Sequence, residues 1–299
     1  MSIYVDMDSL NAGMSFTAAV LSAVMAVGTV LSRAEGRTLE GRAFTGMCLT
    51  DAAMAVGDFL SWALPLPLGP VTQRVVLAGN FIFNVAGAVL FVCYTGYLHG
   101  VFDRAAASLP NGRANYPFER VGLAIAALDS VGCAVSLVTG AFFTAGFGTR
   151  YYRGEFFWVM QLMLNFLYIQ VLMTIVANRR LLGAREIMAL LTYIMLPGMV
   201  NIVQSLFFGA ALINVAITMS LVFIFMGVQH ERELEAARRE HAMAKERLRL
   251  IQARIDPEDL YARLDAARTA LNEDPAQAVR LIGDTSRWLR ERMSALARK

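Results

Sequence analysis

Seven apolar stretches, each about 20 residues long, constrain this chain more than any other feature of its sequence. Hydrophobic residues make up 57% of the chain and the mean hydropathy is +0.49, values far from those of an ordinary soluble domain. The sequence therefore predicts an all-α, polytopic membrane protein. The expected spans are Gly13–Leu31, Phe44–Leu64, Val75–Val101, Val121–Phe143, Phe156–Ala177, Glu186–Phe208 and Ala210–Val228, with a tight turn at Gly209 between the last two.

The distribution of arginine predicts the orientation of these spans. Loops 32–43, 102–120 and 178–185 hold nine arginines, whereas the loops on the other side hold three. The N-terminal segment carries Asp6 and Asp8 without a basic residue. Because basic loops stay in the cytoplasm, we expect a plasma (inner) membrane protein with its N-terminus outside and its C-terminus in the cytoplasm. The formal charge of +3 follows from this topology and gives no indication of nucleic-acid binding.

A heptad pattern continues from the last span into the cytoplasm, through residues 229–255. Alternating spacings of four and three are typical of the stripe that faces a partner helix in a coiled coil. The pattern also runs back into the span through Ser220, Phe223 and Gly227. We therefore predict a rigid helix that could carry a shift or rotation out of the membrane, or one that only pairs two subunits. The heptad positions are His230, Leu234, Ala237, His241, Ala244, Leu248, Ile251 and Ile255.

Residues 256–299 are expected to form a dimerising helical hairpin. Pro257 should end the preceding helix near Ile255, and Asp274 followed by Pro275 is typical of a capped helix start. Two short helices cannot bury their apolar stripes alone, so we predict a homodimer that forms a four-helix bundle. The stripes comprise Leu260, Leu264, Ala267 and Leu271 in the first helix and Val279, Ile282, Ser286, Leu289, Met293 and Leu296 in the second.

Three segments of this hairpin match a known pattern. They are the run Ala-Arg-Ile-Asp-Pro-Glu-Asp-Leu-Tyr-Ala-Arg-Leu from Ala253 to Leu264, the turn Glu-Asp-Pro at 273–275, and Thr-Ser-Arg-Trp-Leu-Arg at 285–290. Together these segments resemble the dimerisation and phosphoacceptor helices of LytS-type sensor histidine kinases. That family carries Gln-Ile-x-Pro-His-Phe-Leu-Tyr-Asn in the first helix and Ser-x-Tyr-Leu-Arg in the second. The resemblance covers about 50 residues and implies a multi-span membrane sensor in front of the hairpin.

The differences from that family concern its chemistry. Glu258 stands where the resemblance places the phosphoacceptor histidine, Asp259 replaces the phenylalanine and Ala262 the asparagine. A carboxylate does not accept and store a phosphoryl group as an imidazole does, and residues 256–299 include no ATP-binding domain. We therefore expect no kinase activity from this chain alone, as either a degenerate relay or a shortened and altered form of a kinase. A response regulator would be the downstream partner of a complete kinase.

Ionisable side chains inside the apolar spans are candidates for a ligand site, because such groups are expensive in lipid. Asp51 and Asp58 lie seven residues apart on one helical face. The outer segment between the fourth and fifth spans adds arginines and tyrosines at the mouth of the bundle. We predict an outward-opening pocket for an unknown small molecule or a peptide, formed by Asp58, Trp62, Asp129, Arg150, Tyr151, Tyr152 and Arg153.

The alternative is that the polar residues in the spans only join helices through hydrogen bonds. We favour that interpretation for Asn80, Asn84, Gln161, Asn165, Asn201 and Gln204. The sequence predicts no cofactor and no metal. Cys48, Cys93 and Cys133 all fall in expected spans without metal-ligand spacing.

Two functions remain possible from the sequence. The first is a transmembrane signal receptor that couples a ligand to the cytoplasmic hairpin. The second is a membrane transporter or channel-like protein with a cytoplasmic dimerisation domain. A retinal photoreceptor is excluded, because Lys245 and Lys299 are the only lysines and neither lies in an expected span.

Overall fold

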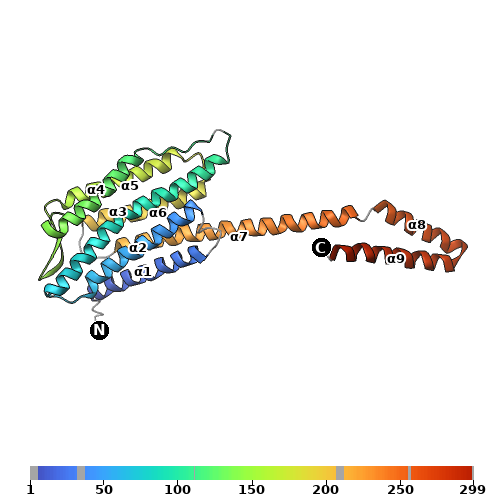
Figure 1. Ribbon diagram of the computed structural model, residues 1–299, viewed down its shortest axis with the longest axis horizontal. Helices are drawn as coiled ribbons and strands as arrows, with labels where there is room; N and C mark the ends of the chain where they lie inside the picture. Colours follow the sequence, from blue (N-terminus) through green and yellow to red (C-terminus); the bar gives the residue numbers. More distant parts are fainter. Residues whose placement is uncertain (1–5, 32–37, 111, 207–211, 255–256, 298–299) are drawn as a thin grey trace. The chain divides into compact units, whose positions relative to one another are not determined.

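The structure is a computed structural model that describes residues 6–31, 38–110, 112–206, 212–254 and 257–297. Side chains at 185, 228–239, 247–254 and 291–297 lie outside this description. The chain divides into two units, Met1–Val228 and Gln229–Lys299. The helices are α1 (Met7–Leu31), α2 (Leu39–Ala63), α3 (Pro70–Ala107), α4 (Glu119–Thr139), α5 (Phe157–Ala177), α6 (Ala184–Leu206), α7 (Leu212–Arg254), α8 (Pro257–Glu273) and α9 (Pro275–Ala297), and the strands are β1 (Phe143–Gly146) and β2 (Thr149–Arg153) (Figure 1).

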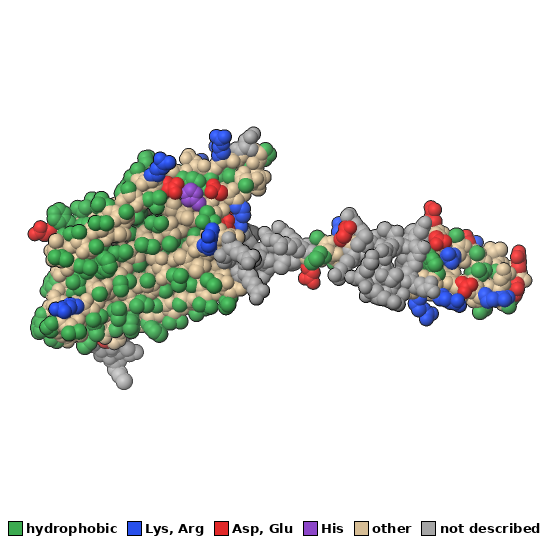
Figure 2. Space-filling view, in the orientation of Figure 1, with side chains coloured by type: hydrophobic (Ala, Val, Ile, Leu, Met, Phe, Trp, Pro, Cys, Tyr) green, Lys and Arg blue, Asp and Glu red, His purple; other side chains and the backbone are tan. Residues whose placement is uncertain are grey.

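The first unit is a helical bundle with the surface of a membrane protein. In the described residues, six helices are long and apolar enough to cross a membrane, and these are α1 to α6. Leu212–Gly227, the apolar start of α7, is shorter, and the predicted beginning of the seventh span at Ala210 lies outside the described residues. Figure 2 shows hydrophobic side chains covering the visible face of the bundle, with charged side chains near its ends.

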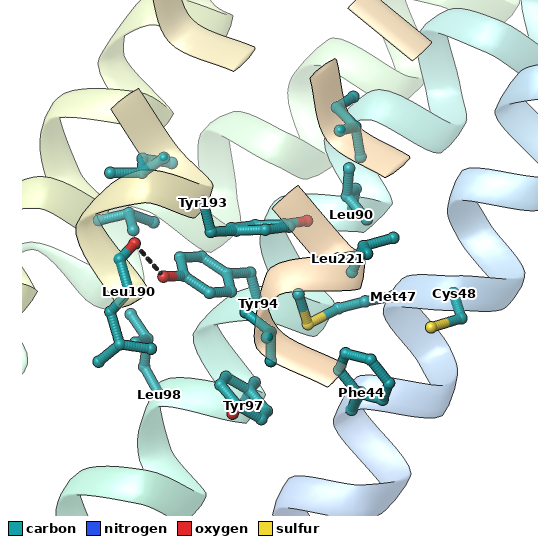
Figure 3. Close-up of a cluster of buried hydrophobic side chains, with 14 of the residues drawn as sticks. Phe44, Met47, Cys48, Leu90, Tyr94, Tyr97, Leu98, Leu190, Tyr193 and Leu221 are labelled. Carbon is teal, nitrogen blue, oxygen red and sulfur yellow. Dashed lines mark hydrogen bonds between the residues drawn. The ribbon is translucent and has the colours of Figure 1, made fainter. Parts of the chain in front are cut away.

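The core of this bundle joins α1, α2, α3, α5, α6 and α7. Tyr94 of α3 is fully buried, and its hydroxyl donates to the carbonyl of Leu190 in α6 at 2.9 Å (Figure 3). Its ring lies against the ring of Tyr193, with the centroids 4.3 Å apart. Met47 of α2 and Leu221 of α7 pack into the same cluster. The helices that carry the candidate site are therefore held in a single packed arrangement.

Two glycines bring α2 and α3 into backbone contact. A Cβ atom on Gly57 would lie 2.6 Å from the carbonyl oxygen of Gly79, and a Cβ on Gly79 would lie 2.5 Å from that of Gly57. Only residues without side chains allow helices to approach so closely. Gly57 precedes Asp58, so this contact fixes the depth and direction of the Asp58 side chain relative to α3.

The segment after α4 differs from the expected all-helical fold. We predicted a span through Phe143, but α4 ends at Thr139, followed by Gly140 in the left-handed conformation with φ 70°. The hydroxyl of Ser136 then accepts from the backbone N–H groups of Phe142 and Phe143 at 2.9 and 3.0 Å. These contacts turn the chain into the antiparallel hairpin β1–β2. The early end of α4 has a local cause, because a serine hydroxyl near the helix end accepts hydrogen bonds from backbone N–H groups that would otherwise continue the helix.

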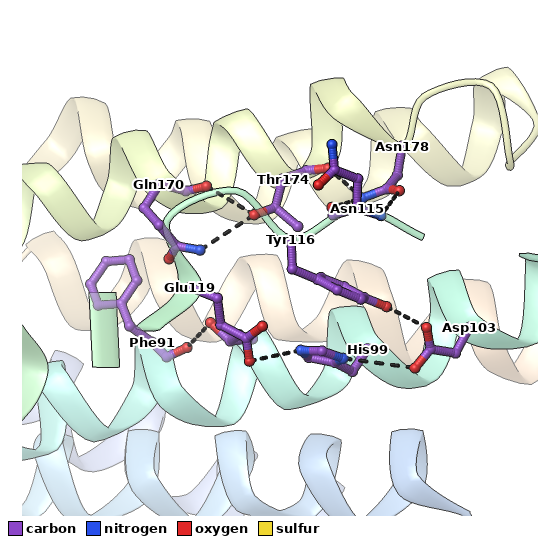
Figure 4. A network of polar contacts seen from close by, with 10 residues as sticks. Phe91, His99, Asp103, Asn115, Tyr116, Glu119, Gln170, Thr174 and Asn178 are labelled. Carbon is purple, nitrogen blue, oxygen red and sulfur yellow. Dashed lines mark hydrogen bonds and ion pairs between the residues drawn. The ribbon is translucent and has the colours of Figure 1, made fainter. Parts of the chain in front are cut away.

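At the other end of the bundle, a polar cluster holds the segment between α3 and α4 (Figure 4). His99 Nε2 lies 2.9 Å from Glu119 Oε1, and the imidazole stacks on the ring of Tyr116 at 3.7 Å. The Tyr116 hydroxyl donates to Asp103 at 2.7 Å. Burial and this hydrogen bond raise the pKa of Tyr116 above its ordinary value. Asn178, which follows the last residue of α5, completes the anchor by bonding both backbone groups of residue 115.

The second unit contains the predicted helical hairpin. The Asp274 carboxylate accepts from the backbone N–H groups of Ala276 and Gln277 at 3.0 and 3.3 Å, and Pro275 begins α9, as the sequence predicted. Small residues are buried between or beside the two helices, namely Ala267, Ala270, Ala278 and Thr285. Large apolar residues remain exposed, namely Tyr261, Leu264, Leu271, Val279 and Ile282.

The predicted coiled coil is not tested by these contacts. Its helix, residues 229–254, is present as part of α7. His241 and Ala244 are exposed, and the side chains of the remaining heptad positions lie outside the described residues.

Candidate ligand-binding site

Asp58 joins three helices near the predicted outer side of the bundle. Its Oδ2 atom accepts from Ser15 Oγ of α1 at 2.6 Å and from Asn214 Nδ2 of α7 at 2.7 Å. Its Oδ1 atom accepts from Trp62 Nε1, one turn along α2, at 3.0 Å. Asp58 is only partly buried, so the carboxylate stays accessible from one side. This arrangement both stabilises the helices and leaves a charged group available to a ligand.

Asp51 makes an equivalent bridge two turns along α2. Its Oδ2 atom accepts from Ser22 Oγ of α1 at 2.5 Å and from Thr218 Oγ1 of α7 at 2.8 Å. Asp51 is 0% exposed and does not line the cavity described below, so it is inaccessible to a ligand there. The two aspartates therefore differ in role, although the sequence places them on the same helical face.

A cavity of about 220 Å³ opens beside Asp58. Five of the seven predicted site residues line it, namely Asp58, Trp62, Arg150, Tyr151 and Arg153. Polar residues that we expected only to join helices also line it, namely Asn80, Asn84, Gln161, Asn201 and Gln204. Several of them have structural partners as well, since Asn201 donates to Gln161 at 3.5 Å and Gln204 accepts from the N–H of Ile213 at 3.3 Å.

The β-hairpin places Arg150 over this cavity. Its guanidinium lies 5.7 Å from the centroid of the Trp62 ring, and its Nη2 atom donates to the carbonyl of Leu64 at 2.8 Å. The same Nη2 lies 2.9 Å from Asp8 Oδ2. The backbone carbonyl of Arg150 accepts from Asn80 Nδ2 of α3 at 3.0 Å. The Arg150 Nε atom is buried and has no hydrogen-bond partner in the described part of the chain.

Arg153 and Tyr151 occupy neighbouring positions on β2. The Arg153 guanidinium lies over the Phe157 ring, 4.6 Å from its centroid. The Tyr151 ring stacks against Phe143, and burial raises the pKa of its hydroxyl, so Tyr151 stays neutral at physiological pH. These side chains give the cavity wall both positive charge and neutral aromatic surface.

Two predicted site residues lie elsewhere. Tyr152 is 51% exposed and does not line the cavity. Asp129 is fully buried in α4, and neither of its carboxylate oxygens has a partner among the described residues. The structure does not bring either residue to the other five.

Sequence reasoning missed several residues of the site. Ser15 and Asn214 bind Asp58, and their hydroxyl and amide groups look like isolated polar positions in apolar spans. Tyr193 lines the cavity with a buried hydroxyl that has no partner in the described residues. One signal was present, because Ser15 and Ser22 repeat the seven-residue spacing of Asp51 and Asp58.

Glu258 is an exposed residue in the first turn of α8. No protein-family model matches the chain, and no curated protein or solved structure matches it. The resemblance to LytS-type kinases therefore stays a prediction that rests on the hairpin sequence.

Proposed function

We propose that this protein is a transmembrane signal receptor, in which a ligand bound in the Asp58 cavity changes the state of the cytoplasmic hairpin. The observation that carries the proposal is the course of α7. Asn214 binds Asp58, Ile213 and Ile217 line the cavity, and the same helix continues to Arg254. A helix is stiff along its axis, so a displacement at its cavity end reaches the residues that precede α8.

The hydrogen bonds of Asp58 supply the trigger. A ligand cation that bonds the carboxylate draws its negative charge toward the cavity and so weakens the bonds that the same carboxylate accepts from Ser15 of α1 and Asn214 of α7. The ligand shifts the equilibrium only if its affinity differs between two positions of α7. Asp51, which is out of the ligand's reach, keeps its bonds to Ser22 and Thr218 and acts as the fixed point.

The output is a homodimer of the α8–α9 hairpin, which follows a seven-span membrane unit whose N-terminus lies outside. Leu264, Leu271, Val279 and Ile282 are exposed in the single chain. Packing these apolar side chains against a second copy would remove them from water in a four-helix bundle. The proposed activity is two-component-type relay without phosphorylation, because Glu258 replaces the acceptor imidazole.

The phosphorylation part of this proposal has its own test. The purified chain, given ATP and magnesium, is expected to incorporate no phosphate. Glu258→His alone is expected to stay unlabelled, and to accept phosphate when the ATP-binding domain of a related kinase is added in trans. Labelling of the unchanged protein on any histidine would contradict the proposal.

The receptor proposal is tested with spin labels at position 241, which is exposed on α7. The three native cysteines are first replaced, and the full chain is placed in lipid nanodiscs with and without a mixture of small metabolites. We expect the label-to-label distance within a dimer to change with ligand, and Asp58→Asn to abolish that change while expression and dimerisation persist. The matched control is Asp51→Asn, which is expected to respond like the parent at reduced stability.

Transport is the second candidate, favoured by one observation. Pro197 lies inside α6 and lines the cavity, and prolines in helices beside a central site are typical of transporters. Uptake of a cavity ligand into sealed vesicles would favour transport, whereas binding without uptake would favour reception.

A further inference from the structure

Opposite charges contact the same indole ring at the wall of the cavity. Trp62 donates its Nε1 hydrogen to Asp58 at 3.0 Å, and the Arg150 guanidinium lies 5.7 Å from the centre of the Trp62 ring. We propose that the cavity binds the zwitterion of a free α-amino acid with an apolar or aromatic side chain. The inference rests on the proposed receptor function, because it names the ligand that the receptor would detect.

The acidic side of the site has room for an ammonium group. An ionised carboxylate offers about four acceptor positions, and Asp58 uses three, for Ser15, Trp62 and Asn214. These three donors are neutral, so the negative charge of Asp58 has no ionic partner among them. A ligand ammonium group would supply both the fourth hydrogen bond and the missing charge.

The basic side has a hydrogen-bond donor without an acceptor. The side chain of Arg150 is 10% exposed, and its Nε atom has no partner among the described residues although the residue lines the cavity. A buried donor of this kind is normally satisfied, so its lack of a protein partner points to an acceptor on the ligand. A ligand carboxylate would supply that acceptor.

The charges that line the cavity balance for a neutral ligand with two ionised ends. Asp8 already pairs with Arg150, which leaves Arg153 to offset Asp58. A simple cation would be repelled by Arg153, and a simple anion would be repelled by Asp58. A zwitterion would pair with both groups. An α-amino acid carries its ammonium and carboxylate groups on the same carbon, which suits charged side chains that lie beside a single indole ring.

The remaining walls select the side chain and limit the size. Aromatic and aliphatic residues dominate beyond the charged end, including Phe83, Phe91, Leu164, Tyr168 and Ile217. The volume of about 220 Å³ is below the range of about 300 to 1,000 Å³ typical of sites for drug-sized molecules. A single amino acid with an apolar side chain fits these limits, whereas a longer peptide does not.

The experiment measures binding of free L-amino acids to the full chain in lipid nanodiscs. The protein-forming L-amino acids are first screened one at a time by thermal stabilisation. The best binder is then compared with its N-acetyl derivative, which lacks the ammonium group, and its amide, which lacks the carboxylate. We expect each derivative to bind at least about tenfold more weakly, as the loss of a charged hydrogen bond predicts.

The variants test which protein side chain binds each end of the ligand. Asp58→Asn is expected to weaken binding of the amino acid and to reduce its affinity advantage over the N-acetyl derivative. Arg150→Lys keeps the charge beside Asp8 but lacks the Nε donor, so it should reduce the advantage over the amide. Asp51→Asn lies outside the cavity and is expected to keep both preferences. Size-exclusion profiles and melting temperatures identify any variant that fails to fold, and the derivatives still test the proposal on the unchanged protein.

The outcomes separate the ligand class from the receptor function. Equal binding of the amino acid and both derivatives would overturn the zwitterion proposal. If no amino acid binds, but another metabolite changes the label distance at position 241 in an Asp58-dependent manner, the ligand class is wrong and the receptor function stands. If an amino acid binds with the expected preferences and the labels do not move, the ligand class stands and the receptor function is wrong.

Discussion

Replacing Thr218 with valine removes one of the two hydrogen bonds that Asp51 accepts, without changing the shape of the side chain. The Thr218 hydroxyl lies 2.8 Å from Asp51 Oδ2, and Asp51 Oδ1 has no partner among the described residues. Hydrogen bonds between helices in a membrane contribute about 0.6 kcal/mol on average and up to about 1.7 kcal/mol. A buried acceptor that keeps a single donor belongs near the upper value, so we expect a loss of about 1 to 1.7 kcal/mol in unfolding free energy.

The assay is reversible unfolding of the full chain in mixed micelles, followed by far-ultraviolet circular dichroism. Thr218→Ser keeps the hydroxyl and should retain most of the stability lost by Thr218→Val. A double-mutant cycle with Asp51→Ala isolates the pair and should give a coupling energy of at least about 0.5 kcal/mol. A coupling near zero, or equal effects of valine and serine, would show that Asp51 does not hold α7 through Thr218.

Three further predictions follow from other parts of the molecule. Ile282→Asp should dissociate the dimer in analytical ultracentrifugation by placing an unpaired charge in the proposed interface, and an unchanged mass would contradict that interface. Because folding raises the pKa of Tyr116, its contribution to stability should be constant below about pH 10 and should fall at higher pH. Tyr116→Phe should remove this fall when melting temperatures are measured between about pH 8 and 11. Gly57→Ala should destabilise the bundle by about 1 to 3 kcal/mol through its clash with Gly79, whereas Gly87→Ala, with open space around it, should not; equal melting temperatures would refute the close contact.

The sequence predicted those features that follow from local composition. Apolar length located the six membrane-length helices, and the Asp274–Pro275 pair located the turn between α8 and α9. It also predicted that Asp58, Trp62, Arg150, Tyr151 and Arg153 come together, because a carboxylate in a span and arginines in an outer loop are both uncommon placements.

The features that the sequence did not predict depend on contacts between distant segments. Tyr193 belongs to an apolar run of α6 and became part of the cavity only through the packing of α6 against α3. Asn214 gives no signal by itself, since its importance comes from a partner 156 positions earlier in the chain. The strands were missed because Ser136 redirects the chain before the apolar pattern ends.

The two aspartates of α2 explain how one helix could be both anchored and movable. Asp51 is sealed from the cavity and holds α1 and α7 through Ser22 and Thr218. Asp58 makes the same kind of bridge but lines the cavity, so a ligand ammonium group at its free acceptor position would weaken the bond from Asn214. A ligand that loosens the outer bridge leaves the inner one intact, and α7 would then tilt about the level of Thr218. This geometry predicts a larger ligand-induced distance change at position 241 than at position 223, which is also exposed on α7, because displacement grows with distance from a pivot. Equal changes at the two positions would instead indicate a sideways shift of α7 without rotation and would exclude the tilt.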